Sequence, residues 1–437
     1  MRFAPTVLIG LCAALLAGAA AAAPPSLALK ARVFEHDMEE RFLLDGQALC
    51  KLRNATPDRP HTDYNMPDNA YMTGIYTATL SMKHAVTRDP ADRERALRSL
   101  RALHLLCTVA GKRGVLARAA WPKDRPTADD GVWRDSPDGV HKWRGDVSTD
   151  QVDGVMFGLY FAHELVAGDE EKRMIADDAS ALLDLIVENN FRIVDVDGKP
   201  TVWSKYHPDH VRKREKMNAL LFLQACKITA HVTGDAKYAD IYRKYAVDEQ
   251  CAEAAVEARI CVNPLMPRAV NHSDDVLQFL AYAPLMHLET DPALRALYEK
   301  SLRRSWEGNG RHPGVAPEGN PFYAFVMAKH LDERGGLEAG LDTLRRFPFR
   351  MKWRPDTIET YRTLFGFDPD PGPLSPEPEE GKPVPVDRRG TTWSAWVQDP
   401  YFGSDWDAPD AVMEYNGHDY LLAYWTGRHY GFLSEEQ

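Results

Sequence analysis

The chain has 437 residues, of which 53 are basic and 64 are acidic, so its formal net charge at pH 7 is −11. This balance argues against a general nucleic-acid-binding or anionic-membrane-binding surface. After the first 23 residues no run reaches the ~18 apolar residues of a membrane span, so we expect a protein with no membrane-spanning segment.

The N-terminus has the features of a secretory signal peptide: Arg2, an apolar run at 7–16 and small residues at 17–23. We expect cleavage after Ala22 and a mature protein, residues 23–437, that is periplasmic or secreted. Its five remaining cysteines are too few for a disulfide scaffold, and Cys251 with Cys261 is the pair best placed to form a bridge.

The helical pattern begins with an amphipathic helix at 28–44, followed by an apolar helix at 68–85 and a charged amphipathic helix at 91–107. The unit of an apolar helix, a short polar turn and a charged helix then recurs. Its further copies are 150–165 with 174–187, 217–231 with 239–251, 274–288 with 293–305, and 320–331 with 337–345. A sixth apolar helix, 417–426, ends the series.

Six apolar helices and five charged ones follow the first helix, which can therefore supply the sixth outer partner and close a ring. We predict an all-α fold, a single-domain (α/α)6 toroid of helical hairpins with long loops. Two segments interrupt the pattern. Residues 117–145 are expected to form a hairpin or lid, and 347–415 contain an exposed Pro-rich connection at 368–386 followed by an ordered aromatic run.

The stretch 143–164 places a polar loop directly before an apolar helix. Ser148 and Gln151 have the spacing of a capping box, which would start the helix at this point. Apolar residues surround this helix, which indicates that it is buried. Gly154, Gly158 and Ala162 form a stripe of small residues that predicts the close approach of another helix.

The loops that lead into the inner helices of such a ring converge on one face, and acids or histidines occur in most of them. Helix capping is the simpler explanation for any one of these acids, and Asp68 and Asn416 fit N-cap positions well. Asp150 with Asp153 exceeds this need because Ser148 already serves as a cap, and Asp274 with Asp275 is a second surplus pair. Our catalytic candidates are Asp150 first, with Asp68, Asp146, Asp153, Asp274 and Asp275 as possible partners.

Paired carboxylates in a partly closed site can differ in pKa, so that one acts as an acid and the other as a base or nucleophile. Glycosidic bond cleavage requires this division of roles. Tryptophans in predicted loops could stack on sugar rings: Trp121, Trp133, Trp143, Trp203, Trp393, Trp396 and Trp406. The candidate substrate-binding residues are Tyr71, His141, Trp143, Arg144, His272, Asn416, His418 and Tyr420.

Two other functions remain open. One is a polysaccharide lyase, in which a Tyr or His abstracts a proton from a uronic acid; its candidates are Tyr71, Tyr415, Tyr420, His141, His272 and His418. The other is a non-catalytic glycan-binding protein. We expect neither a metal nor a cofactor, since the spacing of Asp146, Asp150 and Asp153 matches no calcium loop.

The six-hairpin pattern resembles the (α/α)6 toroid carbohydrate-active enzymes. DNAYMTGIY at 68–76 and DVSTDQVDGVMFGLY at 146–160 are similar in layout to the unsaturated glucuronyl and rhamnogalacturonyl hydrolases. The resemblance implies a glycoside hydrolase acting on an oligo- or polysaccharide, with glycans that contain uronic acid among the candidates. It makes Asp68, and Asp146 or Asp150, the counterparts of the aspartates that act while water adds to the sugar ring. The chain departs from these families at 149–153, where Thr-Asp-Gln-Val-Asp replaces their Arg-Gly-Gln-Ala-Trp run.

Overall fold

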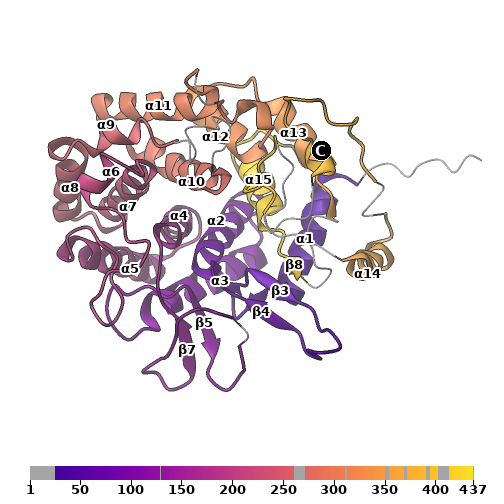
Figure 1. The fold of residues 1–437 in the computed structure, drawn as a ribbon, viewed down its shortest axis with the longest axis horizontal. Helices are drawn as coiled ribbons and strands as arrows, with labels where there is room; N and C mark the ends of the chain where they lie inside the picture. The colour runs from indigo at the N-terminus through magenta and orange to yellow at the C-terminus, as the bar shows by residue number, and fades with distance from the viewer. Residues whose placement is uncertain are drawn as a thin grey trace, which may run out of the picture.

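The computed structural model describes residues 25–127, 129–259, 271–310, 313–349, 354–368, 372–389, 394–401 and 413–436. Within these residues, six apolar helices form an inner ring (Figure 1). They are α2 (Asn69–Thr87), α4 (Thr149–Leu165), α7 (Met217–Thr233), α10 (His272–Leu288), α12 (Pro321–Leu331) and α15 (His418–His429). Each packs against the next in chain order and α15 packs against α2, so the ring is closed.

An outer layer of helices surrounds the ring. It consists of α1 (Leu27–Arg41), α3 (Pro90–Thr108), α5 (Asp169–Glu188), α8 (Ala236–Arg243), α11 (Pro292–Glu307) and α13 (Leu337–Arg346). Helix α1 packs on α15, as expected for the partner that completes the circle. The predicted all-α (α/α)6 toroid is therefore confirmed. The outer helix predicted at 239–251 is divided, because α8 passes into a π-helical turn at Lys244–Asp248 before a short helix α9 (Cys251–Ala255).

The polar turns between inner and outer helices act as helix starts. Asp89, Asp235 and Asp291 are the N-cap residues of α3, α8 and α11. Each carboxylate accepts a hydrogen bond, 2.8 Å long, from the backbone N–H two residues further on. Such caps satisfy N–H groups that have no partner inside the helix. The sequence pattern of the repeats therefore has a direct structural cause.

Helices α2 and α4 approach so closely that only glycine fits between them. A Cβ atom added to Gly74 would lie 1.9 Å from the backbone oxygen of Gly154, and one added to Gly158 would lie 2.6 Å from the oxygen of Gly74. The predicted close contact along the stripe of small residues is confirmed. It brings the first turns of α2 and α4, with their aspartates, to neighbouring positions.

Short antiparallel strands form small sheets next to the ring. The predicted hairpin at 117–145 is a three-stranded sheet in which β7 (His141–Arg144) lies between β5 (Ala119–Pro122) and β6 (Trp133–Asp135). A second sheet joins the two ends of the chain, since β3 (Lys51–Arg53) pairs with both β4 (Asp63–Asn65) and β8 (Met413–Tyr415). Further strands and α-helices of the described residues are β1 (Leu43–Leu44), β2 (Gln47–Ala48), α6 (Pro208–Val211) and α14 (Pro355–Phe365).

Two local predictions at helix starts were wrong. Ser148 occupies the N-cap position of α4 but its side chain makes no capping hydrogen bond. The side-chain amide of Gln151 donates instead to the Ser148 hydroxyl, at 3.4 Å, and across to the Asp68 carboxylate, at 3.2 Å, so the capping box does not form. At α15 the N-cap is Gly417, one residue after the predicted Asn416.

Several predictions concern residues outside the described ranges: the signal peptide at 1–22, Cys261, Trp393 and Trp406. Cys251, the expected partner of Cys261, is a buried free thiol. Part of the Pro-rich connection, 369–371, also lies outside them, and the segment from 372 onward contains a short 3-10 turn at Val386–Arg388. None of the helices among the described residues combines the length and the apolar character needed to cross a membrane.

Candidate active site

The first turns of α4, α7 and α10 surround a cavity of 610 Å³, which we call the large cavity. Its wall includes Asp150, Trp203, Lys205, Glu215 and Asp274. The N-termini of helices carry a partial positive charge, so anionic groups are favoured at this face of the ring. Because residues from the starts of three inner helices line this cavity, the loops that lead into those helices meet at one site, as expected for a toroid.

A second hollow, of 170 Å³, adjoins the large cavity; we call it the small chamber. Asp150 and Ser273 line both spaces, which makes them parts of one site. The small chamber is also lined by Asp68 and Tyr71 from the start of α2, by His418 from the start of α15, and by Leu277, Ser394 and Val397. Residues from both halves of the sequence thus converge on it.

Asp68 and Asp150 are the two carboxylates of the small chamber. Asp68 is the N-cap residue of α2, yet its side chain makes no capping hydrogen bond and accepts from Gln151 instead. Burial raises the pKa of Asp68 to about 6, and the negative charge of Asp150 acts in the same direction. Burial also raises the pKa of Asp150, while the charge of Arg118 opposes this shift. One proton can therefore remain on the pair in mildly acidic solution.

Arg118 is the cation nearest to this pair among the groups that shift its pKa. Its guanidinium lies 3.6 Å from the Asp68 carboxylate and is held by hydrogen bonds to two backbone oxygens, those of Asp146 at 2.6 Å and Pro67 at 2.9 Å. Burial lowers the pKa of Arg118, and the charges of Asp68 and Asp150 oppose that effect. The backbone contacts fix a positive charge beside the two acids.

The far side of the large cavity combines acids with an exposed aromatic ring. Trp203 is 51% exposed, and the ammonium group of Lys205 lies 4.7 Å from its ring centre. Lys205 also forms a 2.6 Å ion pair with Glu215. Asp274 accepts a 2.8 Å hydrogen bond from the Asn271 amide, and burial, with the charges of Asp275 and Asp150, raises its pKa to about 8. An exposed indole beside polar groups suits the face of a sugar ring.

The other predicted acids lie away from the two cavities. Asp153 is fully buried one turn after Asp150. Neither of its oxygens has a hydrogen-bond partner in the described part of the chain, and burial raises its pKa well above the usual value. Asp146 has a left-handed backbone (φ 56°) and accepts from the Val202 N–H at 3.0 Å, which closes a loop. Asp275 is buried and paired with Arg259 at 2.8 Å.

Three predicted binding residues belong to strand β7 and do not line either cavity. Trp143 is buried, with the Arg134 guanidinium 5.2 Å from its ring centre. Arg144 pairs with Asp129 at 3.2 Å, and His141 lies 2.6 Å from Asp138 in the hairpin. The strand lies next to α4 in sequence, but these side chains contact residues of the β5–β7–β6 sheet and its loops.

Of the remaining candidates, Tyr71 and His418 line the small chamber and three others do not. Asn416 is buried and donates to the Leu49 oxygen at 2.7 Å, and Tyr420 donates to the Leu27 oxygen at 3.0 Å inside the core. His272 is buried among carboxylates. Among the tryptophans of the described residues, Trp203 alone lines either cavity.

Sequence reasoning missed Arg118, Lys205 and Glu215. Glu215 stands two residues before α7, in the one inner-helix loop that offered no clear motif, so the same comparison of loops could have found it. Arg118 and Lys205 come from longer loops, where no spacing rule applied.

No protein-family model matches the chain, and no curated protein sequence matches it. Solved structures do match it. A family GH76 α-mannanase from Bacteroides thetaiotaomicron aligns with a TM-score of 0.50 at 8% identity, over 93% of this chain and 96% of that one. A sugar epimerase from a ruminal bacterium (TM-score 0.49, 10% identity, 92% and 98% covered) and an unsaturated glucuronyl hydrolase specific for heparin (0.45, 11%, 93% and 96%) are also similar. At these identities the likeness concerns the fold, and this chain is an (α/α)6 toroid.

Proposed function

We propose that this chain is a carbohydrate-active enzyme that hydrolyses glycosidic bonds of an oligo- or polysaccharide. The observation that carries the proposal is the pair Asp68 and Asp150, which come from the two most closely packed inner helices and line one chamber. The Asp68 carboxylate caps no helix, and burial raises the pKa of both acids. The same fold in an α-mannanase supports the substrate class.

In the proposed reaction the pair divides two tasks. Asp68, whose pKa burial and the negative charge of Asp150 raise to about 6, donates its proton to the glycosidic oxygen as that bond breaks, and ionised Asp150 removes a proton from the attacking water. The proton that leaves water restores the pair, so the net change is the addition of one water molecule across the bond. Trp203 would stack on a sugar in the large cavity. Lys205 and Arg118 are cations of the wall. Each would pair with the carboxylate of a uronic acid in competition with Glu215 or Asp68.

The direct test is to replace each acid by its amide and assay a panel of neutral and uronate-containing glycans. Asp150→Asn and Asp68→Asn should each lower kcat/KM by roughly 10²- to 10⁴-fold, the range lost with a general acid or base. Asp240→Asn, at an exposed position on the outer helix α8, is the matched control and should retain full activity. Full activity in Asp150→Asn would remove this residue from the mechanism, and inactivity of the wild type on every glycan would favour a binding protein.

A second candidate function is β-elimination, because Tyr71 and His418 line the same chamber. Burial, with the charge of Asp153, raises the pKa of Tyr71 well above 10, so its phenol would keep its proton and His418 would act as the base. The ultraviolet absorbance of the products separates the two reactions. Elimination creates an unsaturated uronate and raises this absorbance, whereas hydrolysis of a saturated glycan leaves it unchanged and removal of an unsaturated uronyl group lowers it.

We also propose export, on the basis of the signal-peptide features at 1–22. Expression of the full chain with N-terminal sequencing of the exported product should give a mature end at Ala23. Retention of an uncleaved N-terminus inside the cell would contradict this proposal.

A further inference from the structure

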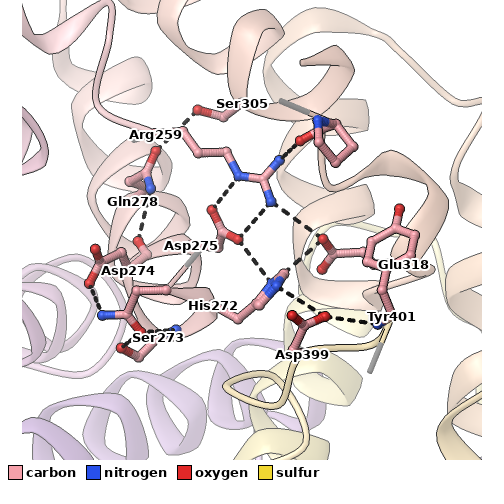
Figure 2. A network of polar contacts seen from close by, with 12 residues as sticks. Arg259, His272, Ser273, Asp274, Asp275, Gln278, Ser305, Glu318, Asp399 and Tyr401 are labelled. Atoms are coloured by element: carbon pink, nitrogen blue, oxygen red, sulfur yellow. Dashed lines mark hydrogen bonds and ion pairs between the residues drawn. The ribbon is translucent and has the colours of Figure 1, made fainter. Parts of the chain in front are cut away.

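A compact polar cluster lies at the start of α10, beside the site but outside both cavities (Figure 2). It contains His272 and Asp275 of α10, Glu318 of the 3-10 turn η2 (Ala316–Glu318), and Asp399 of the segment 394–401. Figure 2 shows the three carboxylates around the His272 ring. His272 is 3% exposed and Asp275 is 1% exposed, so the cluster is shielded from water.

Among the residues that the structure describes, neither nitrogen of the His272 ring has a hydrogen-bond partner. Nδ1 is 3.4 Å from Asp275 Oδ2 and 3.6 Å from Glu318 Oε1, and Nε2 is 3.6 Å from Asp399 Oδ1. Hydrogen bonds between N–H and oxygen span about 2.7–3.2 Å, so all three separations exceed that range. A buried polar group left without a partner is costly and calls for an explanation.

The two separations from Nδ1, 3.4 Å to Asp275 and 3.6 Å to Glu318, are close to the edges of a metal coordination shell. A tetrahedral ion bound at about 2.0–2.1 Å holds its ligand atoms about 3.3–3.4 Å apart. One ligand atom each from His272, Asp275 and Glu318 can be chosen so that all three lie within 4.8 Å of one another. Each carboxylate oxygen has more than one lone pair, so it can bind an ion while it accepts from Arg259.

We propose that His272 Nδ1, Asp275 Oδ2 and Glu318 Oε1 bind a divalent transition-metal ion, with Zn²⁺ as the ion that best suits one imidazole and two carboxylates. Asp399 Oδ1, 3.6 Å from Nε2, faces the other ring nitrogen of His272 and would need to move closer to hold the ring by a hydrogen bond, as carboxylates do behind many metal-bound histidines. Sequence spacing led to the expectation of a chain without a metal. Spacing could not reveal this site, because His272 and Asp275 are neighbours on α10 but the third ligand, Glu318, comes from a separate turn.

The charges around the ring also call for a cation. Asp275, Glu318 and Asp399 are negative, while Arg259 binds Asp275 at 2.8 and 3.1 Å and Glu318 at 3.4 Å, and the buried Arg389 adds a second positive charge. With a neutral imidazole the three carboxylates and two guanidinium groups sum to −1, so a cation is favoured at the ring; a proton would bring the sum to zero and a divalent ion to +1. The distances separate these two cases: an imidazolium would donate two hydrogen bonds, and separations of 3.4 to 3.6 Å exceed the range for either.

The ion would affect the neighbouring site by holding in place the segments that line it. Its ligands His272 and Asp275 flank Ser273 and Asp274, which line the large cavity. Asp399 lies in the same segment as Ser394 and Val397, which line the small chamber. A bound metal would therefore fix the start of α10 and this segment relative to each other.

The test uses the full chain, treated with a chelator, dialysed and then supplied with ZnCl₂, MnCl₂ or CaCl₂. We expect one equivalent of tightly bound Zn²⁺ by elemental analysis and a Tm that rises by several degrees with Zn²⁺ and less with Ca²⁺. Glu318→Gln and His272→Ala should lose both effects, and Asp399→Asn should lower the affinity about 10- to 100-fold. His61→Ala, which removes a histidine that is 60% exposed elsewhere, is the control and should bind Zn²⁺ as the wild type does.

Failure of the wild type to retain a metal or to gain stability from any of the three ions would overturn the proposal, as would unchanged Zn²⁺ binding by both Glu318→Gln and His272→Ala. The pH dependence of the Tm gain from Zn²⁺ is an independent test of metal binding. Because ligands must lose their protons, the Tm gain from Zn²⁺ should grow from pH 5.5 to 7.5. If His272 is protonated instead of metal-bound, its raised pKa of about 10 predicts that the folding stability of the protein declines as the pH rises toward 10. Added metal would then not change the Tm.

Discussion

At the scale of single residues, Asp68 shows a conflict between stability and a poised acid. A carboxylate at a helix N-cap is favoured by about 0.3–1 kcal/mol through the helix dipole. Burial, assisted by the charge of Asp150, nevertheless raises its pKa to about 6, a shift of about two units that corresponds to roughly 3 kcal/mol against the ionised form. Burial outweighs the dipole at this position. The ionised form of Asp68 therefore lowers the stability of the folded protein, which a residue with a purely structural role would have no reason to do.

This conflict predicts that Asp68→Asn stabilises the protein at pH 7. The folded pKa of about 6 exceeds the unfolded value of about 3.9, so the folded state binds more protons between them and stability falls as the pH rises through that window. An amide avoids this loss and still accepts from Gln151, so we expect a gain of roughly 1–2 kcal/mol at pH 7 and almost none at pH 4. Urea unfolding at both pH values measures it, with Asp240→Asn as the control. A variant less stable than the wild type at pH 7 would show that the pairing with Arg118 dominates.

The candidate site was predictable only where its residues begin inner helices. Asp68, Tyr71, Asp150, Asp274 and His418 were singled out because each lies at such a start, and all five line the two cavities. Sequence reasoning gave equal weight to the residues of 141–144, which are close to Asp150 along the chain. Their side chains are used within the β5–β7–β6 sheet, and this orientation depends on strand pairing that the sequence pattern did not determine.

At the scale of elements, the inner helices were the most predictable parts of the fold. Apolar residues surround each of these helices, so the length of the apolar run indicates where the helix begins and ends. For example, α4 begins one residue before the predicted start at Asp150 and ends at the predicted Leu165. The strands were less accessible because each has only two to four residues. The π-helical turn after α8 and the separate helix α14 follow no periodic signal.

The closest contact of two elements gives a sharp prediction for Gly74→Ala. In a helix this change ordinarily favours stability by up to about 1 kcal/mol, but here the new Cβ would overlap the Gly154 backbone oxygen, at 1.9 Å. Neither backbone can yield without moving a helix, so we expect a net loss of roughly 2–3 kcal/mol. The control is Gly335→Ala, whose Cβ would meet only the flexible Glu333 carboxylate, at 3.2 Å. Equal stability of the two variants, measured by urea unfolding, would contradict the tight α2–α4 contact.

At the scale of the whole molecule, the ring depends on contacts between its two ends. Phe34 of α1 is fully buried, and its ring centre lies 5.1 Å from that of Tyr420 in α15 and 4.7 Å from that of Phe349. Lys30 of the same helix donates to backbone oxygens at the end of α13, including those of Arg345 at 2.6 Å and Phe347 at 2.9 Å. The count of six inner helices implied this closure, but the residues that make it follow no repeat.

Phe34→Ala should therefore destabilise the entire protein rather than release α1 alone. Removing a fully buried aromatic side chain costs roughly 3–5 kcal/mol. Leu364→Ala, on α14 at a position 58% exposed, should change stability by less than about 0.5 kcal/mol. Calorimetry would show one cooperative transition at a lower Tm for Phe34→Ala. A wild-type Tm, or a separate small transition with the main one unchanged, would mean that α1 does not complete the ring.

The central claim is that Asp68 and Asp150 act together on a glycan in the small chamber. The most direct measurement is a crystal structure of Asp150→Asn with an oligosaccharide that the wild-type enzyme cleaves. We predict a glycosidic oxygen within hydrogen-bond reach of Asp68, about 2.6–3.2 Å, with the side chain at position 150 facing the same sugar and Trp203 stacked on the next. A saccharide bound with both positions out of reach, or bound elsewhere on the ring, would contradict the claim.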